Sequence, residues 1–191
     1  MTRLERDFFT RDVLTVAPDL INKILARRIP NGEVLRFRIT ETEAYRGEED
    51  SACHARAGKT KRTSILYETG GCTYIYLCYG IHNLLNVVTG HSGFPQAALL
   101  RGGIMLRENE NSERDFSASP PRHDGPGKLT KAAEIDLSLN GLDLTLSNEI
   151  WLEDDGVLPH YTTSPRVGIN YASEPYRNML WRFIAQPLPL P

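Results

Sequence analysis

The chain has 191 residues, of which 40% are hydrophobic and 24% charged, a composition typical of one globular domain with its own core. No apolar run approaches the roughly 18 residues of a membrane span, and the charged start does not resemble a signal peptide. We therefore expect a soluble intracellular protein without a membrane partner. The formal net charge of −2 excludes a strongly basic protein, so any binding of nucleic acid must depend on a local patch.

Cysteine and histidine usage argues against a metal or disulfide protein. The cysteines are odd in number and form no CxxC motif, and no histidine has a ligand spacing to a cysteine or to another histidine. We expect no disulfide framework, no structural or catalytic metal, and no cofactor.

The first predicted elements are a short helix and a hairpin. Pro18, as the first helical residue, predicts a helix over residues 17–22, which Asn22 ends in the left-handed conformation. Strands over residues 24–29 and 33–45, joined by the turn Pro30-Asn31-Gly32, predict a β-hairpin.

The rest of the chain is predicted to add strands, a helix and two loose segments. We expect strands over 72–79, 84–89 and 96–101, a helix over 128–135, and closing segments over 143–152 and near 166–169. A segment rich in Asn, Ser, Pro and charge predicts a mobile connection over about 107–127, and 187–191 is predicted to be a loose tail. Because no βαβ alternation occurs, we expect one α+β domain, residues 1–191, with a mostly antiparallel sheet.

The second strand of the hairpin carries two carboxylates. Alternation places on one face the row Leu35, Phe37, Ile39, Glu41, Glu43 and Tyr45. Carboxylates that continue an apolar row are costly to bury unless the row opens into a polar cleft. Either the strand twists into solvent with two exposed acids, or it places a carboxylate at the rim of a pocket, where burial raises its pKa and makes it a base.

Three further groups of residues allow a functional and a structural interpretation. Tyr74 and Tyr76 share one face of a strand and Tyr79 precedes a glycine turn, a pattern that also suits ordinary packing in a sheet. Asn86 lies inside an apolar strand and must find hydrogen-bond partners. Residues 51–66 contain no acid and four basic residues, which predict either a solvated loop or a nucleic-acid contact: Arg56, Lys59, Lys61 and Arg62.

Taken in order, these segments resemble the alkyladenine (3-methyladenine) DNA glycosylase family, from Leu14 to about Phe183. The matching segments are Glu41-Thr-Glu43-Ala-Tyr45, His54-Ala-Arg56, Thr60-Lys-Arg62, Tyr74-Ile-Tyr76-Leu-Cys-Tyr79-Gly80, Leu85-Asn86-Val87, Leu99-Leu-Arg101, Gly125-Pro-Gly-Lys128-Leu129 and Arg166-Val-Gly-Ile169. Each motif is weak alone, whereas the ordered set is specific. One departure is Gly102-Gly-Ile-Met after Arg101, where relatives often have Ala-x-Glu-Pro.

The resemblance implies a fold and an activity. The family fold is a single compact α+β domain on a curved antiparallel sheet with flanking short helices. The implied enzyme is a monomeric, monofunctional DNA glycosylase that needs no cofactor and starts base excision repair. It would flip alkylated or deaminated purines, such as 3-methyladenine, 7-methylguanine and hypoxanthine, out of double-stranded DNA and hydrolyse the N-glycosidic bond. It would act inside the cell with the DNA, which means the cytoplasm or nucleoid if the source is a bacterium.

The resemblance also implies residue roles. Glu43 would deprotonate the attacking water. The walls that stack on the flipped base would be Tyr45, His54 and Tyr76. Tyr79 would fill the gap left in the duplex, and Asn86 would reject guanine. The remaining basic residues would support the pocket or contact the DNA backbone: Arg56, Lys59, Lys61, Arg62, Arg101 and Lys128.

Two other functions fit parts of the pattern. A carbohydrate glycosidase could use Glu41 and Glu43 as its carboxylate pair, since residues two apart on a strand lie roughly 7 Å apart; the presence of only two tryptophans argues against sugar stacking. A nucleic-acid-binding module would keep the basic residues and tyrosines without needing Glu43. The acidic row and the tyrosine cluster contain no lysine, which favours water over a lysine nucleophile.

Overall fold

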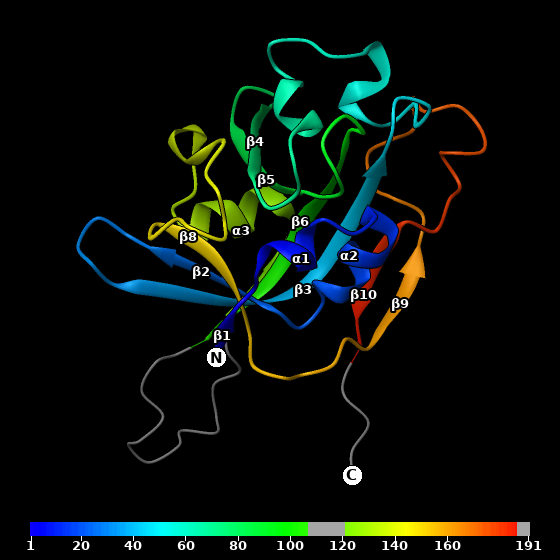
Figure 1. The fold of residues 1–191 in the computed structure, drawn as a ribbon. Helices are drawn as coiled ribbons and strands as arrows, with labels where there is room; N and C mark the ends of the chain where they lie inside the picture. Colours follow the sequence, from blue (N-terminus) through cyan, green and yellow to red (C-terminus); the bar gives the residue numbers. More distant parts are fainter. Residues whose placement is uncertain (107–120, 187–191) are drawn as a thin grey trace.

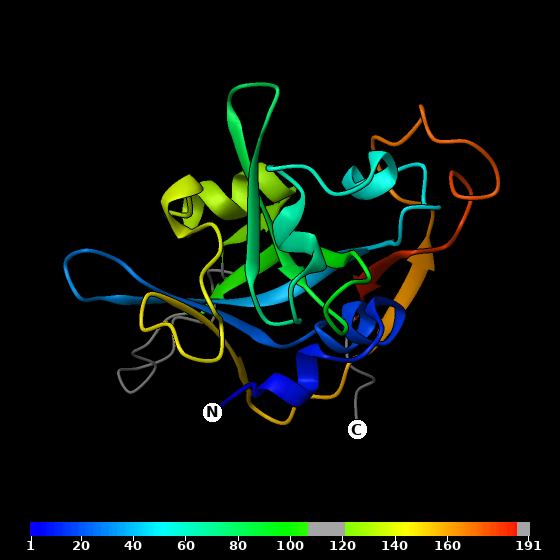
Figure 2. The same ribbon diagram turned by 45° about the horizontal axis from the view of Figure 1, so that its top comes forward.

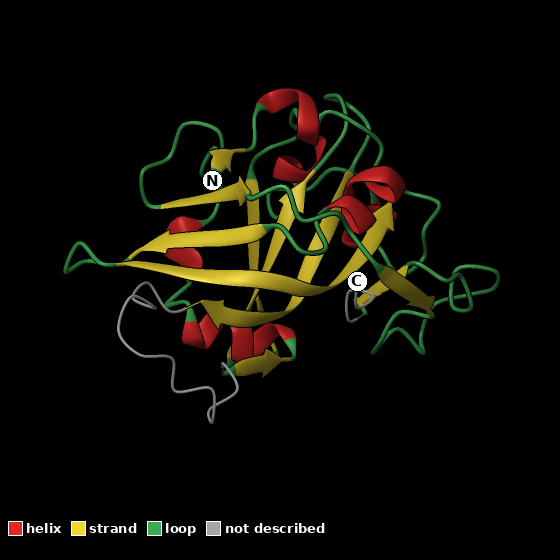
Figure 3. Ribbon diagram, turned by 90° about the horizontal axis from the view of Figure 1, so that it is seen from below, coloured by secondary structure: helices red, strands yellow, loops and turns green. Residues whose placement is uncertain are grey.

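A computed structural model describes residues 1–106 and 121–186 of the chain. The predicted α+β fold is confirmed: the described residues form a ten-stranded sheet whose strand pairs are all antiparallel, with short helices packed against it (Figures 1 and 3). The strands are β1 (Thr2–Arg3), β2 (Ile24–Arg28), β3 (Val34–Arg46), β4 (Thr73–Cys78), β5 (His82–Val88), β6 (Gln96–Leu106), β7 (Arg122–Asp124), β8 (Ile150–Asp154), β9 (Tyr161–Ser164) and β10 (Arg182–Ala185). The helices are α1 (Arg6–Phe9), α2 (Val13–Asp19) and α3 (Pro126–Ala132), with short 3-10 helices η1 (His54–Ala57), η2 (Ser64–Tyr67) and η3 (Leu137–Leu139).

The long strands β3 and β6 form the central pair of the sheet. The main path runs β1-β8-β2-β3-β6-β5-β4. On the edge of β3 that faces away from β6, the partner is first β2 and then β10. On the edge of β6 that faces away from β3, the partner is first β5 and then β7. The neighbours of both central strands therefore change near their middles, and the sheet branches there.

A register irregularity lies at this branch. Ile39 pairs with Gly103 and Glu41 with Gly102, and the register then passes to Thr42 and Leu100, skipping Arg101. Backbone approach is tight here, because a Cβ on Gly102 would lie 2.9 Å from the Thr40 hydroxyl oxygen. The Gly-Gly sequence after Arg101 thus suits a local bulge.

The bulge overturns the prediction that one face of β3 runs unbroken from Leu35 to Tyr45. Phe37 and Ile39 belong to the main hydrophobic core, but beyond the bulge Ala44 joins that core and the Thr42 hydroxyl donates to a backbone oxygen of α2. Simple alternation fails because an extra residue in one strand reverses its parity. Glu43 and Tyr45 are thereby turned away from the core.

The first long helix begins earlier in the sequence than residues 17–22, where the proline signal predicts it. It spans Val13–Asp19, begins at Asp12, whose carboxylate accepts from the Leu14 amide, and holds Pro18 near its end. The Asp12 cap stabilises an earlier start than the proline signal indicated. Asn22 does adopt the predicted left-handed conformation, with φ 69°.

The predicted connection over 107–127 is wrong in its last part. Residues 107–120, like the predicted tail 187–191, lie outside the described residues. Residues 122–124 form β7 on β6, and α3 starts at Pro126, after Gly125 with φ 113°. Proline at the first helical position explains why the helix begins two residues before its predicted start.

The later strands differ mainly in length from their predictions. β4 and β5 lie within or close to the predicted ranges, whereas β6 continues five residues past Arg101. Only residues 150–152 of the predicted segment 143–152 belong to a strand, β8, which continues to Asp154. Residues 166–169 belong to no strand.

A second, smaller hydrophobic cluster lies at one end of the sheet. The segment from residue 47 to 70, with η1 and η2, covers β4, β5 and β6 there, at the top of Figure 1. Its buried members are Cys53, Ala55, Leu66, Tyr67, Tyr74, Val88 and Ala97. This cover creates the pocket described next.

Candidate active site

A pocket opens between the covering segment and the sheet. The empty space between its lining atoms, including the open solvent at its mouth, is about 370 Å³. The pocket brings together residues from four strands (β3, β4, β5 and β6), from the covering segment with η1 and η2, and from the segment after β9. They line it as follows: Tyr45, Ala52, Cys53, His54, Leu66, Tyr74, Tyr76, Asn86, Ala97 and Tyr171. Four residues predicted to contact a base, Tyr45, His54, Tyr76 and Asn86, thus meet in one pocket.

Two aromatic residues are locked against each other on one side of the pocket. The His54 and Tyr76 ring centroids are 4.5 Å apart at an interplanar angle of 71°, and His54 Nδ1 lies 2.8 Å from the Tyr74 hydroxyl. Burial, together with the nearby charges of Arg62 and Arg56, lowers the pKa of His54 to about 4. The imidazole is therefore neutral at pH 7 and does not repel a cationic ligand.

Asn86 lies on β5 between two strands of the sheet. Its side-chain amide donates to the backbone oxygens of Tyr74 at 3.1 Å and Leu84 at 3.4 Å. These bonds satisfy a polar group in an apolar strand and fix the side chain. The structural role considered for Asn86 is therefore present, in addition to its place in the pocket lining.

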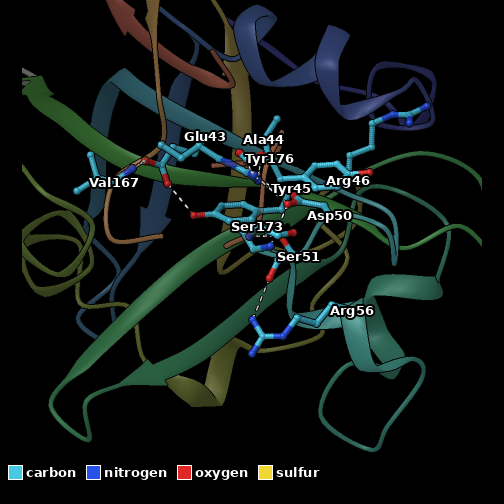
Figure 4. Close-up of polar contacts among 12 residues, drawn as sticks. Glu43, Ala44, Tyr45, Arg46, Asp50, Ser51, Arg56, Val167, Ser173 and Tyr176 are labelled. Atoms are coloured by element: carbon cyan, nitrogen blue, oxygen red, sulfur yellow. Dashed lines mark hydrogen bonds and ion pairs between the residues drawn. The ribbon is translucent and has the colours of Figure 1, made fainter. Parts of the chain in front are cut away.

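Glu43 lies directly behind the pocket wall. Its side chain has no exposed surface; Oε2 accepts from the Tyr45 hydroxyl at 2.8 Å and Oε1 from the Val167 amide at 2.7 Å (Figure 4). Burial raises the pKa of Glu43 above 4.5, against the lowering influence of Arg101, of the Val167 amide and of Tyr45. Val167, whose amide donates one of these bonds, is itself 46% exposed.

Glu41 and Glu43 share one arginine. Arg101 Nε lies 2.7 Å from Glu41 Oε1 and 3.4 Å from Glu43 Oε1, and Arg182 Nε donates to the same Glu41 oxygen at 2.6 Å. Glu41 is thus bound by two guanidinium groups, whereas Glu43 approaches only Arg101 among these two arginines. Neither acid twists out into solvent, so the interpretation of two exposed acids is wrong.

A fully buried ion pair supports the other side of Tyr45. Arg166 and Asp50, both with 0% side-chain exposure, contact each other at 2.5 Å and 2.9 Å. The Arg166 guanidinium carbon lies 4.7 Å from the Tyr45 ring centroid and 5.1 Å from that of Trp181.

The predicted basic run lies at the mouth of the pocket. A second hollow beside the first shares His54 and Tyr171 with it and includes Arg56 and Arg62 in its lining. Arg62 lies 5.4 Å from the Tyr76 ring centroid. Lys59 lies over the ring of Tyr67, and Lys61 is exposed in the same segment. These four basic residues form the rim of the pocket: Arg56, Lys59, Lys61 and Arg62.

The remaining predicted residues lie farther along the surface. Tyr79, 91% exposed and with φ 52°, is at the tip of the β4–β5 hairpin, which projects from the body of the molecule in Figure 2. Lys128 is exposed on α3, a helix that packs against β5 and β6, and does not line the pocket.

Sequence reasoning missed several residues of the site. Tyr171 lines both hollows, and Val167 and Arg182 contact the acidic pair, yet all three come from the C-terminal part of the chain. The Arg166-Val-Gly-Ile169 motif was the available signal for Val167. No local pattern marks Tyr171 or Arg182, because their partners lie more than a hundred residues away.

The described residues offer neither a metal site nor a membrane helix. Across residues 1–106 and 121–186, no group of three or more His, Cys, Asp or Glu side chains could hold an ion. In the same ranges no helix has the length and apolarity needed to cross a membrane. The three cysteines are free thiols.

Comparison with known proteins gives one consistent result. A family model described as methylpurine-DNA glycosylase matches residues 7–189. Relatives provisionally named 3-methyladenine DNA glycosylases include those of Natranaerobius thermophilus, 43% identical over 98% of this chain and 97% of its own length, and Psychrobacter cryohalolentis, 42% identical over 93% and 89%. A third, from Methanocella arvoryzae, is 41% identical over 96% of this chain and 92% of its own length.

Proposed function

We propose a reaction and residue roles from one premise: the chain belongs to the methylpurine-DNA glycosylase family. It is therefore a hydrolase that acts on N-glycosyl bonds in DNA, as the resemblance implied. The proposal concerns which bases it removes and how. We infer that it acts inside the cell as a monomer, without a cofactor, and that it accepts double-stranded DNA with 3-methyladenine, 7-methylguanine or hypoxanthine.

The substrate must leave the base stack before the reaction. C1′ of a stacked nucleotide is out of reach inside a duplex, so the nucleotide is extruded into the pocket. Tyr45, Tyr76 and the neutral His54 would stack on the flipped base, with roughly 1–3 kcal/mol for each stacking contact. A positively charged methylpurine is attracted to the electron-rich faces of these rings. Tyr79 would fill the gap in the duplex, since its side chain is free at the hairpin tip.

Glu43 is the proposed base. As the glycosidic bond lengthens, positive charge develops on the sugar, and a carboxylate beside it stabilises that charge and takes a proton from the attacking water. The observation that carries this assignment is a buried carboxylate of raised pKa, bonded to the hydroxyl of a pocket wall. Arg101, at 3.4 Å, would favour the ionised form of Glu43.

Asn86 is proposed to exclude guanine by its fixed position. Both side-chain N–H contacts go to backbone oxygens, so the amide cannot turn aside for an exocyclic amine at C2. Exclusion would therefore depend on crowding. Hypoxanthine and adenine lack that amine and would fit.

The basic residues are proposed to contact the DNA backbone. Arg56, Lys59, Lys61 and Arg62 lie around the pocket mouth, where the flipped strand would pass, and Lys128 would contact a phosphate farther along. Such contacts position the duplex without reading its sequence.

The glycosidase alternative is disfavoured by the acids themselves. An inverting or retaining pair flanks an open cleft, whereas Glu41 is held between two arginines and shares one of them with Glu43.

Base release decides between the three candidate functions. The protein is incubated with matched duplexes that carry 3-methyladenine, 7-methylguanine, hypoxanthine or no lesion, and free base is measured chromatographically. We expect release from the damaged duplexes and no strand cleavage. Hydrolysis of an aryl glycoside without base release would favour the sugar hydrolase, and DNA binding without release would favour the binding module.

A further inference from the structure

Arg166, the first residue of the Arg166-Val-Gly-Ile169 motif, places a charged side chain in the protein interior, where charges are rare. The Arg166 guanidinium and the Asp50 carboxylate form a two-pronged ion pair, at 2.5 Å and 2.9 Å, with both side chains fully buried. Desolvation of two charges offsets much of their mutual attraction, so net stabilisation alone is a weak reason for such a pair.

The guanidinium joins three segments that are distant in the sequence. Besides binding Asp50, Nη1 donates to the Ala44 oxygen of β3 at 2.9 Å and Nη2 to the Tyr176 oxygen at 3.1 Å. Asp50 in turn accepts from the Ala52 amide at 3.0 Å and the Arg46 amide at 3.2 Å. Figure 4 shows Ala44, Asp50 and Tyr176 converging there. One planar group thus fixes β3, the segment after it and the segment after β9 relative to one another.

These contacts bracket the proposed base. Ala44 lies between Glu43 and Tyr45 in the chain, and Val167 directly follows Arg166. The Glu43 carboxylate accepts hydrogen bonds from the Tyr45 hydroxyl and from the Val167 amide. Tyr45 follows Ala44, whose oxygen Arg166 binds, and Val167 follows Arg166 itself. The guanidinium also lies over the Tyr45 ring, itself part of the pocket lining.

We propose that Arg166, held by Asp50, is a positioning residue that sets the Val167 amide and the Tyr45 hydroxyl on the Glu43 carboxylate. This rests on the proposed function, in which Glu43 is the base. The pair touches neither the base nor the sugar; it acts through Glu43 and Tyr45.

Loss of the Arg166 contacts should change the pH dependence of base release. The groups that face Glu43 are Arg101 from β6, Glu41 and Tyr45 from β3, and the Val167 amide, with weaker charge interactions from Arg166 and from Tyr76 of β4. The Val167 and Tyr45 hydrogen bonds both lower the pKa of Glu43. Their loss raises that pKa, and because a base must be ionised, the acidic limb of the rate profile then moves to higher pH.

Arg166→Lys tests the proposal with the charge retained. An ammonium group cannot reproduce the planar fork that binds Asp50 and two backbone oxygens. We expect the single-turnover rate of base release per active site to fall about 10-fold to 10²-fold at pH 7, as for a small misplacement of a reacting group. The acidic limb should move to higher pH, while affinity for undamaged duplex stays at the parent value.

A matched control and a second variant guard against loss of fold. Arg36→Lys makes the same change in an arginine that pairs with Glu153 at 3.0 Å on the same sheet, and its pH profile should match the parent's. The double variant Asp50→Asn, Arg166→Gln removes both charges and leaves neither unpaired; it should shift the limb in the same direction. Titrated active sites correct each rate for unfolded protein.

Failure of the positioning role of Arg166 and failure of Glu43 as the base give different results. If a folded Arg166 variant keeps the parent rate per site and the parent limb, the positioning role is wrong. If both variants fail to fold, the pair serves stability and the proposal is again wrong. If Glu43→Gln releases base at the parent rate, the base assignment has failed, whatever Arg166 does.

Discussion

The layer behind the pocket and the rim in front of it hold their charges in opposite ways. Behind the pocket, arginines and carboxylates pair with each other and have little or no exposed surface: Glu41, Glu43, Asp50, Arg101, Arg166 and Arg182. At the rim, Lys59 and Arg62 lie over aromatic rings, and Arg56 combines a ring contact with a hydrogen bond to the Ser51 oxygen.

The difference indicates a division of work. The paired charges are screened little and have fixed geometry, which suits the tuning of one reacting carboxylate. The rim charges can exchange counterions for phosphates at little structural cost. Changes behind the pocket should therefore alter the rate and its pH dependence, and changes at the rim should alter binding and its salt dependence.

The largest effect is expected behind the pocket. Glu43→Gln keeps the size of the side chain and an acceptor for the Val167 amide but cannot take a proton. We expect base release to fall 10²–10⁴-fold, the usual range for a general base, with DNA affinity preserved. Single-turnover release and fluorescence anisotropy on the same duplex measure both. The melting temperature should not fall, since the variant removes a buried charge. Equal losses of DNA affinity and of base release would contradict the division of work between the buried layer and the rim.

At the rim, joint neutralisation of Lys59, Lys61 and Arg62 to Gln should weaken binding of undamaged duplex by up to roughly 10²-fold at 0.1 M salt. The log–log slope of affinity against salt should flatten by about 0.9 for each charge that contacts a phosphate. The control variant is Arg28→Gln, which neutralises an exposed arginine at the end of β2. Arg28 lies over the ring of Trp151, as Lys59 and Arg62 lie over their own aromatic rings. A slope equal to the parent's would locate the DNA-binding face elsewhere.

Tyr79 tests the exposed tip of the β4–β5 hairpin. Tyr79→Ala should reduce base release from duplex about tenfold, as expected for the loss of one stacking contact, and release from single strands much less. Only the duplex has a gap to fill. Ile81→Ala, at an exposed position on the same hairpin tip, measures the contribution of general apolar contact. Equal losses on the two substrates for Tyr79→Ala would make it a packing residue.

The sequence predicted the rim better than the layer behind it. The four rim residues come from one short segment, 51–66, and Tyr79 comes from one hairpin, so local composition and a glycine turn are sufficient signals for them. Pocket walls on β3, β4 and β5 could be grouped through the family resemblance.

The ion pairs behind the pocket could not be predicted, for two physical reasons. Asp50 and Arg166 are 116 residues apart, and Glu41 and Arg182 are 141 apart, so no local periodicity links them. The bulge at Glu41 also reversed the alternation on which the face assignment depended. The alternation predicts Glu43 at the rim of a pocket, but its carboxylate is fully buried behind Tyr45, because the row leaves the core face at the bulge.

The smallest expected effect gives the sharpest test of the layer behind the pocket. Glu41 raises the pKa of Glu43 by like charge, and it also binds Arg101, which lowers that pKa. Glu41→Gln removes the like charge and releases Arg101 towards Glu43. Both changes lower the Glu43 pKa, so Glu43 stays ionised further into acid.

The acidic limb of Glu41→Gln should therefore move to lower pH, opposite to the shift expected for Arg166→Lys. At pH 7 the less basic carboxylate should slow base release only a few-fold. Glu153→Gln, another acid paired with an arginine on this sheet, controls for general damage and should leave the limb in place. Damage to the fold lowers the active fraction but gives no reason for two variants to move the limb in opposite directions. Shifts of the same sign in both would mean that the charges around Glu43 do not set its ionisation.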